Sequence, residues 1–308
     1  MSAVTPDIIV DPNVAKATGL PVVRERAKIT PRKRATKWAF SLLGLIVALI
    51  WAFPVYWMVL SAFTPNAQLR TTTPQFLPVH ATWRNFEAIF QEGSFWPALR
   101  MSLAITGVTL VAVLLFAFLG ALAISRFRFK GRKSFILAVL FIQMLPAEGL
   151  FIAQYRMLAS TGMLNRVWGV SLFYTAAIIP FTIWMLRGFV AGVPAELEEA
   201  AMVDGLSRTR AFFKITLPLL MPGLIASGVF AFLQAWNEFT IALVALPANS
   251  ANTLPLWLRT FMTASVARGV DWAQVMAAST LIAIPVIIFF LFVQGRMTSG
   301  LVSGAVKG

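Results

Sequence analysis

The chain contains no cysteine among its 308 residues, and it has a single histidine, His80. Without cysteine it can form no disulfide, no thiolate nucleophile and no zinc–cysteine site. One histidine, in a proline-containing loop, offers no histidine-based metal site and no Ser-His catalytic triad. The sequence also lacks the G-x-x-x-x-G-K-[ST] loop that binds nucleotide phosphates, so we expect no ATP hydrolysis by this chain.

Charged residues are scarce as well. They make up 12% of the chain, whereas hydrophobic residues make up 58%. Soluble domains contain about 25% charged residues. Together with a mean hydropathy of +0.78, this balance predicts a membrane protein.

Six segments are apolar over the length of about 20 residues that a helix needs to cross a bilayer. We therefore expect an all-α, polytopic membrane protein with six transmembrane helices. The six segments are 38–61, 101–124, 134–155, 167–186, 219–246 and 273–294.

The first 37 residues are polar, basic and proline-bearing, which does not match a cleavable signal peptide. We expect residues 1–37 to be a disordered cytoplasmic tail, followed by a transmembrane region over 38–295. The first span would then serve as an uncleaved anchor. Residues 296–308 are expected to form a frayed cytoplasmic C-terminal tail.

Lys and Arg residues are distributed unequally between the two sides of the predicted spans. Most lie in the N-terminal tail, between residues 126 and 133, between 187 and 218, or after residue 295. Because cytoplasmic loops carry the excess of Lys and Arg, both termini are predicted to be cytoplasmic. The charges follow topology, so no nucleic-acid partner is expected. The opposite side carries Arg70, Arg84, Arg100, Arg156, Arg166, Arg259 and Arg268.

A polar stretch between the fourth and fifth spans, residues 194–218, is called the elbow here. Pro194 suits a first helical position, and Glu196, Glu198 and Glu199 follow where carboxylates interact favourably with the positive helix end. Gly205 fits a left-handed position that ends this helix.

A second helix of the elbow is predicted from Arg208 to Leu217, with Ser207 as its cap and Pro218 as its end. Two interpretations of the elbow are open. It is an amphipathic helix on the inner leaflet, or it docks in a protein groove. The glutamates favour the groove, because acidic residues are repelled by an anionic leaflet.

The elbow resembles the EAA loop of bacterial binding-protein-dependent ABC importer permeases. The matching residues are Glu199-Ala200-Ala201, Gly205 and Ile215-x-Leu217-Pro218. From about residue 38 onward, the chain is similar to the MalG-like permease subunit of the carbohydrate-uptake-1 group. The further segments that carry this resemblance are PQFLPVHATWRNFEAIF (74–90), GMLNRVWGVSLFY (162–174), AWNEFTIAL (235–243) and GLVSGAVKG (300–308).

The resemblance implies a type I ABC importer permease fold in the bacterial cytoplasmic (inner) membrane, surrounded by membrane lipid. It implies a heterodimer with a MalF-like second permease, and a dimeric cytoplasmic ABC ATPase that binds ATP and Mg. A solute-binding lipoprotein or periplasmic protein would deliver a sugar, and this chain would hold no cofactor. The C-terminal tail would insert towards the ATPase dimer interface. The implied ATPase-coupling residues are Glu198, Glu199, Ala200, Ala201, Asp204, Gly205, Ile215, Leu217 and Pro218.

Polar residues inside the predicted spans are candidates for the translocation pathway, because such groups are costly in hydrocarbon. A sugar passage needs amides, carboxylates and an aromatic face. The alternative role is hydrogen bonding between helices. The candidates are Gln143, Glu148 and Gln154 in the third span and Gln234, Trp236, Asn237 and Glu238 in the fifth.

Three other functions compete with sugar import. The first is an ABC permease for a non-sugar solute such as glycerol phosphate or a polyol. A phosphate substrate would require arginines, and Arg100 and Arg156 leave this possibility open. An ion-coupled secondary transporter would use Glu148 and Glu238 as proton sites. A membrane enzyme is the third, although no catalytic constellation supports it. The outer loop 62–100 is the candidate contact for the binding protein.

Overall fold

The computed structural model describes residues 31–71, 73, 75–77, 79–144, 146–248, 251–265 and 269–305. Side chains are described for these residues except 31–36, 147–148, 265 and 296–305. The expected N-terminal tail therefore lies largely outside the described residues. The chain divides into two compact units, residues 1–55 and 56–308.

Every described element is helical, which confirms the predicted all-α fold. Helix α2 (Pro31–Ala62) begins in the first unit, where its side chains from residue 37 to 55 are apolar for the most part and exposed. The elements of the second unit are α3 (Asn66–Leu69), α4 (Arg84–Gln91), α5 (Phe95–Arg126), α6 (Arg132–Ile142), the 3₁₀ helix η1 (Ala147–Leu150), α7 (Phe151–Ser160), α8 (Val167–Gly192), α9 (Glu196–Val203), α10 (Arg208–Ala211), the π-helix η2 (Phe212–Thr216), α11 (Leu217–Asn237), α12 (Thr240–Ala245), α13 (Leu254–Ser265) and α14 (Trp272–Ala305).

Five helices in the described part of the chain are long and apolar enough to cross a membrane. They correspond to five of the six predicted spans. Helix α14 continues to Ala305, past the predicted end of its span at residue 294, so the segment 296–305 is helical and not a frayed tail. The five segments are Lys37–Ala62, Phe95–Arg126, Val167–Gly192, Arg208–Asn237 and Trp272–Gly295.

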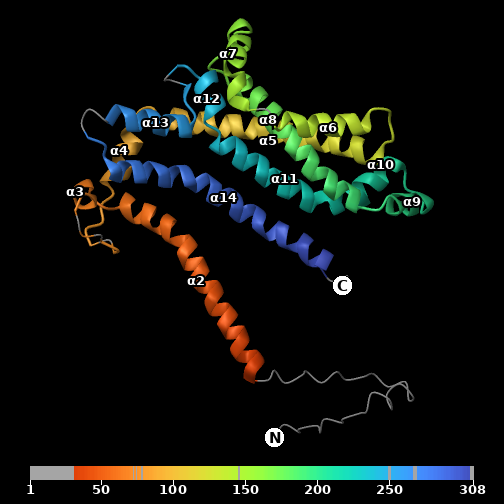
Figure 1. Cartoon of the computed structure of the whole chain (residues 1–308), viewed down its shortest axis with the longest axis horizontal. Coiled ribbons are helices and arrows are strands. Elements are labelled where there is room, and N and C mark those ends of the chain that lie inside the picture. Colours follow the sequence, from red (N-terminus) through yellow and green to blue (C-terminus); the bar gives the residue numbers. More distant parts are fainter. Residues whose placement is uncertain are drawn as a thin grey trace. The chain divides into compact units, whose positions relative to one another are not determined.

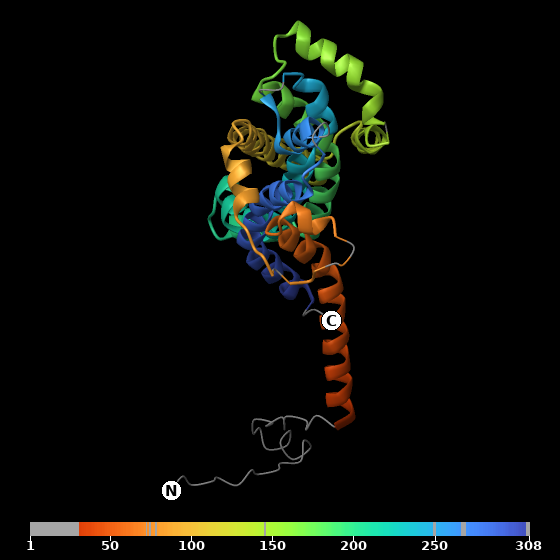
Figure 2. The same cartoon turned by 90° about the vertical axis from the view of Figure 1, so that its left-hand side faces the viewer.

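The prediction of one continuous helix over 134–155 is wrong. Helix α6 ends at Ile142, and the chain resumes as η1 and then α7. Pro146 lies in this break and has no backbone N–H to donate, and Gly149 follows as a poor helix former. A sixth crossing by a broken helix, which membrane proteins tolerate within a bundle, stays a prediction. Both views show α7 at the edge of the second unit (Figures 1 and 2).

The prediction that Pro218 ends the second helix of the elbow is also wrong. Helical structure continues without a break from Arg208 to Asn237. Pro218 lies at the start of α11, directly after the π-helix η2 (Phe212–Thr216). The π-helix η2 joins the elbow to this span, with the N–H of Leu217 bonded to the carbonyl of Phe212. The fifth predicted span is broken later instead, between α11 and α12.

Helices α5, α8 and α11 pack side by side and form the centre of the second unit (Figure 1). Small residues allow the close approach: Ala117 and Ala121 of α5 are fully buried beside Ile183 and Leu186 of α8. A Cβ atom added to Gly223 of α11 would lie 2.4 Å from Cγ of Phe189.

Gly223→Ala is therefore expected to destabilise the protein. The added methyl group overlaps the Phe189 ring, and overpacking of this kind costs about 1–3 kcal/mol. Thermal unfolding of the detergent-purified protein measures the effect. Gly107→Ala, also within a long helix, is the control, because a Cβ atom there meets nothing within 4 Å. Equal melting temperatures for Gly223→Ala and the wild type would contradict the close packing.

The two ends of the second unit differ in their loops. The turn between α5 and α6 lies at the same end of the bundle as α9 and α10, whereas α3, α4 and α13 lie at the other end (Figure 1). At that other end, Arg70 donates to the carbonyl of Val270 at 2.9 Å, and Asn66 accepts from the N–H of Trp272 at 3.2 Å. Two of the predicted cytoplasmic loops, 126–133 and the elbow, thus share one end, and the predicted outer loop 62–100 lies at the opposite end (Figure 1).

Candidate functional site

The elbow is a capped helical corner. Helix α9 begins at Glu196, two residues later than Pro194, and ends at Val203. Gly205 follows its C-cap, and its φ of +90° is left-handed as predicted. The N–H of Leu206 bonds to the carbonyl of Ala201 and the N–H of Gly205 to that of Met202, both at 3.0 Å. This Schellman pair satisfies carbonyls at the helix end. The predicted cap of the second helix is confirmed, since Oγ of Ser207 accepts from the N–H of Arg210 at 3.4 Å.

One face of α9 is open to solvent. It contains residues at the helical spacing i, i+3, i+4 and i+7, which places them on one side. We call this set the exposed face of α9. Val203, the apolar member at the end of this face, has 87% of its surface accessible. The members of the exposed face are Glu196, Glu199, Ala200 and Val203.

Glu198 points the other way, although it neighbours Glu199 in the sequence. Its side chain is only 17% exposed and lies 3.8 Å from Nη2 of Arg126 at the end of α5. Thr216, which is fully buried in η2, donates its hydroxyl hydrogen to Oε1 of Glu198 at 2.5 Å. We call Arg126, Glu198 and Thr216 the Glu198 junction.

The remaining predicted coupling residues are divided between the two sides of the elbow. Ala201 is buried, and Ile215 and Leu217 are half-buried, so these three pack towards the spans. Asp204, Gly205 and Pro218 are exposed. A pocket of about 630 Å³ lies between the elbow and the end of α5. Its lining includes Leu122, Arg126, Phe127, Glu198, Met202 and Phe212.

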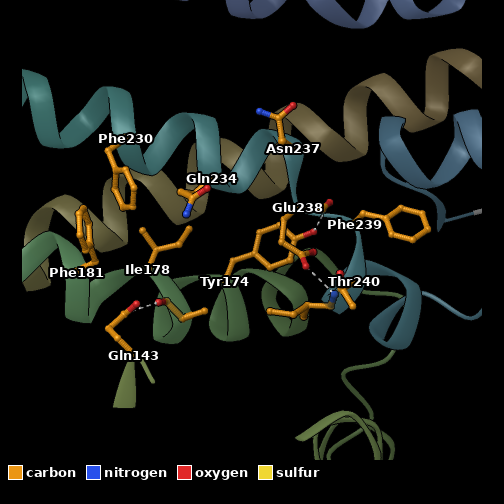
Figure 3. A pocket seen from close by; sticks show the side chains of 12 residues that line it. Gln143, Tyr174, Ile178, Phe181, Phe230, Gln234, Asn237, Glu238, Phe239 and Thr240 are labelled. Atoms are coloured by element: carbon orange, nitrogen blue, oxygen red, sulfur yellow. Dashed lines mark hydrogen bonds between the residues drawn. The ribbon is translucent and has the colours of Figure 1, made fainter. Parts of the chain in front are cut away.

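A second pocket, of about 380 Å³, lies among α8, α11 and the start of α12 (Figure 3). Two aromatic rings, Phe181 and Phe230, form one wall with centroids 4.5 Å apart. Amide, hydroxyl and carboxylate groups complete the lining, and most of them come from the same two helices, α8 and α11 with its C-cap residue Glu238. The polar lining residues are Gln143, Tyr174, Gln234, Asn237, Glu238 and Thr240.

Glu238 shapes the end of this pocket through the backbone. It ends α11, and its carboxylate accepts from the N–H of Ile241 at 2.7 Å and from that of Ala242 at 3.1 Å. These two N–H groups belong to the first turn of α12, which has no partner for them within the helix. The hydroxyl group of Tyr174 donates to the backbone carbonyl of Glu238 at 3.3 Å. Glu238 thereby holds α8, α11 and α12 together.

Comparison with known proteins decides the family. The family described as "Binding-protein-dependent transport system inner membrane component" matches residues 32–301. The chain belongs to this family. The predictions of a transport permease and of an inner-membrane location are thereby confirmed.

Individual relatives of this permease are named for saccharide uptake. It is 44% identical over 256 residues to the diacetylchitobiose uptake system permease protein DasC of Streptomyces coelicolor, covering 83% of this chain and 92% of DasC. It is 34% identical to the arabinooligosaccharides transport system permease protein AraQ of Halalkalibacterium halodurans, covering 88% and 96%. It is 32% identical to the trehalose transport system permease protein SugB of Mycobacterium tuberculosis, covering 90% and 99%.

A solved structure shares the fold of this permease. A chain of a bacterial ABC transporter that imports the acidic polysaccharide alginate has a TM-score of 0.70 and 24% identity, covering 86% of this chain and 98% of that one. At this identity the likeness concerns the fold. It supports the predicted ABC importer permease fold independently of the elbow motif.

The pocket of this permease brings together some of the predicted pathway residues and separates others. Gln143, Gln234, Asn237 and Glu238 line it. Trp236 does not: it is 2% exposed, and its Nε1–H donates to the carbonyl of Ile282 in α14 at 3.3 Å. Successive helix residues are rotated by about 100°. Trp236 therefore faces α14, while its neighbour Asn237 reaches the pocket.

The other predicted residues of the third span lie elsewhere. Gln154 is in α7 and is half-buried, but it is not among the lining residues. The side chain of Glu148 lies outside the described residues. Gln143 donates to the carbonyl of Ala177 at 3.4 Å, so it also links its own segment to α8.

Sequence analysis did not single out the residues that α8 contributes to the pocket. Tyr174, Ile178 and Phe181 follow one another at i, i+4 and i+7 and therefore share one helix face. The sequence feature that could have identified this face is Tyr174, an aromatic residue with a hydroxyl group, on the same side of the helix as Phe181. In a span where nearly every residue is apolar, this pattern does not stand out from the lipid-facing residues.

Proposed function

We propose that this chain is one permease subunit of an ATP-driven, binding-protein-dependent sugar importer. It forms half of the translocation pathway, beside a second, related permease. The observation that carries the proposal is the exposed face of α9, which is held in a fixed orientation by the Schellman pair at Gly205 and by the cap at Ser207. A capped corner that exposes Val203 beside two carboxylates suits docking in a protein groove.

The partner in that groove is a dimeric cytoplasmic ATPase, which binds and hydrolyses ATP with Mg. This chain itself is non-catalytic. ATP-driven closure of the ATPase dimer displaces the elbow, and the bundle changes between outward-open and inward-open states. Both ATP and the loaded binding protein must bind the same state better, because a ligand shifts an equilibrium only through differential affinity.

A sugar is the substrate that the pocket suits best. Pyranose hydroxyl groups bind amides and hydroxyls, and the apolar faces of the rings pack on aromatic side chains. Gln234, Asn237 and Tyr174 supply the first kind of group, and Phe181 and Phe230 supply the second. The saccharides in the names of DasC, AraQ and SugB point to the same class. No arginine is among the described residues that line the pocket, which disfavours a phosphate-bearing solute.

Reconstitution tests this function. The chain, its partner permease, the ATPase and the binding protein are placed in proteoliposomes, and uptake of labelled N,N′-diacetylchitobiose, trehalose and glycerol 3-phosphate is followed. Uptake of one of the two sugars is expected, and it requires ATP and the binding protein. Uptake by this chain alone, or uptake of glycerol 3-phosphate in preference to both sugars, would overturn the proposal.

The pocket amides are expected to contribute to uptake. Gln234→Ala and Asn237→Ala each remove one hydrogen-bonding group, which is worth about 0.5–1.5 kcal/mol, or about two- to tenfold in sugar uptake at low concentration. Initial uptake rates in proteoliposomes measure the loss. Ser160→Ala, which removes an exposed hydroxyl group at the end of α7 and outside loop 62–100, is the control and should leave uptake unchanged. Unchanged uptake in both pocket variants would remove this pocket from the pathway.

The membrane orientation can be tested directly because the chain has no cysteine. Val203→Cys on the elbow and Val79→Cys at the opposite end are both at exposed positions. In cells, a membrane-impermeant maleimide is expected to label Val79→Cys only. In inside-out vesicles from cells that lack the partner ATPase, which would otherwise cover this residue, it should label Val203→Cys only. The reverse pattern would place the elbow outside the cell and exclude a cytoplasmic ATPase as its partner.

A further inference from the structure

Glu198 and Glu199 are chemically alike and adjacent, yet their environments differ. Glu199 belongs to the exposed face of α9. Glu198 is turned towards the spans and contacts Arg126 and Thr216. Because a rotation of about 100° separates neighbours on a helix, one carboxylate is available to an outside partner and the other is used within the chain.

The Glu198 junction joins three elements. Arg126 is the last residue of α5, Glu198 lies in α9, and Thr216 is the last residue of η2. The same carboxylate oxygen, Oε1, takes part in both contacts. A movement of α9 therefore acts on the end of α5 and on the start of α11 through a single side chain.

The contact with Thr216 is made at an unusual turn. In η2 the backbone bonds follow the wider i→i+5 pattern, and such turns are rare within helices and are frequent at functional sites. This turn connects the elbow to the long helix that lines the pocket. The hydrogen bond from Thr216 fixes the elbow at this turn, so α11 is pulled along when α9 moves.

The contact with Arg126 pairs the charge of a guanidinium group whose nitrogens Nε and Nη2 are buried. Nε and Nη2 of Arg126 are buried and make no hydrogen bond within the described residues, so the carboxylate of Glu198 is the compensating charge for the guanidinium group. Removing one partner of a buried pair leaves the other charge unpaired. The pair therefore holds the end of α5 against the elbow.

We propose that Glu198 is a positioning residue for energy coupling: it transmits the displacement of the elbow to α5 and α11, while Glu199 and the rest of the exposed face of α9 bind the ATPase. This inference rests on the proposed function, since it needs an ATPase that moves the elbow. It assigns separate roles to two neighbouring glutamates that were predicted from the sequence as members of one set of ATPase-coupling residues. Loss of Glu198 uncouples transport from hydrolysis without releasing the ATPase.

The test uses the complete transporter in proteoliposomes. The variants are Thr216→Val, which removes only the hydroxyl group, Thr216→Ser, which keeps it, and Glu198→Gln. Three quantities are measured for each: the ATPase that co-purifies, ATP hydrolysis stimulated by the loaded binding protein, and sugar taken up per ATP hydrolysed. A misfolded permease loses its bound ATPase, so the amount of co-purified ATPase reports on folding. Uptake per ATP hydrolysed, measured in variants that keep the ATPase, reports on coupling.

Thr216→Val and Glu198→Gln are expected to keep the bound ATPase and to lower uptake per ATP about tenfold, the effect of one hydrogen bond to a charged group. Thr216→Ser should retain the wild-type ratio. An unchanged ratio in Thr216→Val, or a loss of bound ATPase in Glu198→Gln as large as in Glu199→Lys, would overturn the inference.

Failure of the proposed function gives a different result. In that case Glu199→Lys keeps both bound ATPase and uptake, whatever the variants of the Glu198 junction do. A double-mutant cycle of Arg126→Gln and Glu198→Gln completes the test. Coupled residues give effects on uptake per ATP that are not additive, whereas additive effects would contradict a joint role.

Discussion

Val203→Asp is expected to release the ATPase from the purified transporter. Val203 is 87% exposed at the end of the exposed face of α9, where an apolar side chain gains by burial in a partner. A carboxylate there would have to be desolvated beside Glu199, at an interface already rich in negative charge. Hot-spot substitutions of this kind cost about 2 kcal/mol or more, which corresponds to about a 30-fold loss of affinity.

Co-purification of the ATPase with a tagged permease measures the loss. Val79→Asp is the matched control, since it makes the same change at an exposed valine between α3 and α4, two helices that lie at the opposite end of the second unit (Figure 1). It should retain the ATPase in full. Val203→Ile should also retain it, because the side chain stays apolar. If Val203→Asp binds the ATPase as well as the control does, the exposed face of α9 is not the docking surface.

Hydropathy was sufficient to find the long membrane helices, because length and apolarity are properties of each segment alone. It failed over 134–155, where the composition suits a span but Pro146 and Gly149 interrupt the helix. Hydropathy also did not predict that η2 joins the elbow to α11 in one continuous helical stretch that includes Pro218. Local propensity treats proline as a helix terminator, whereas here the π-helix η2 precedes Pro218 and helical structure continues to Asn237.

In the candidate sites, features set by neighbouring residues could be predicted from the sequence, whereas features set by contacts between distant residues could not. The left-handed Gly205 and the cap at Ser207 were predictable, because both depend on neighbouring backbone groups. The different orientations of Glu198 and Glu199 were not, because they are set by Arg126, which is distant in sequence. Likewise, Trp236 was grouped with Asn237 by adjacency, although packing against α14 turns it away.

Glu238→Ala is expected to abolish most of the uptake, whereas Glu238→Gln should retain most of it. The carboxylate accepts from two N–H groups of α12, at Ile241 and Ala242, and alanine leaves both without a partner. Each buried N–H that loses its partner costs about 1–3 kcal/mol, so the wall of the pocket that α12 forms is expected to open. The amide oxygen of glutamine can still accept one of these bonds.

Initial uptake rates should fall about tenfold or more in Glu238→Ala. Ser160→Ala, at an exposed position at the end of α7, is the control that should leave them unchanged. The glutamine variant also decides between an ATP-driven permease and an ion-coupled transporter. A proton site requires an ionisable group, so Glu238→Gln would then be as inactive as Glu238→Ala, and uptake would follow a pH gradient without ATP. A structural cap requires only an acceptor oxygen, so Glu238→Gln should then keep most of the uptake. In the presence of ATP, a protonophore should leave this uptake unchanged.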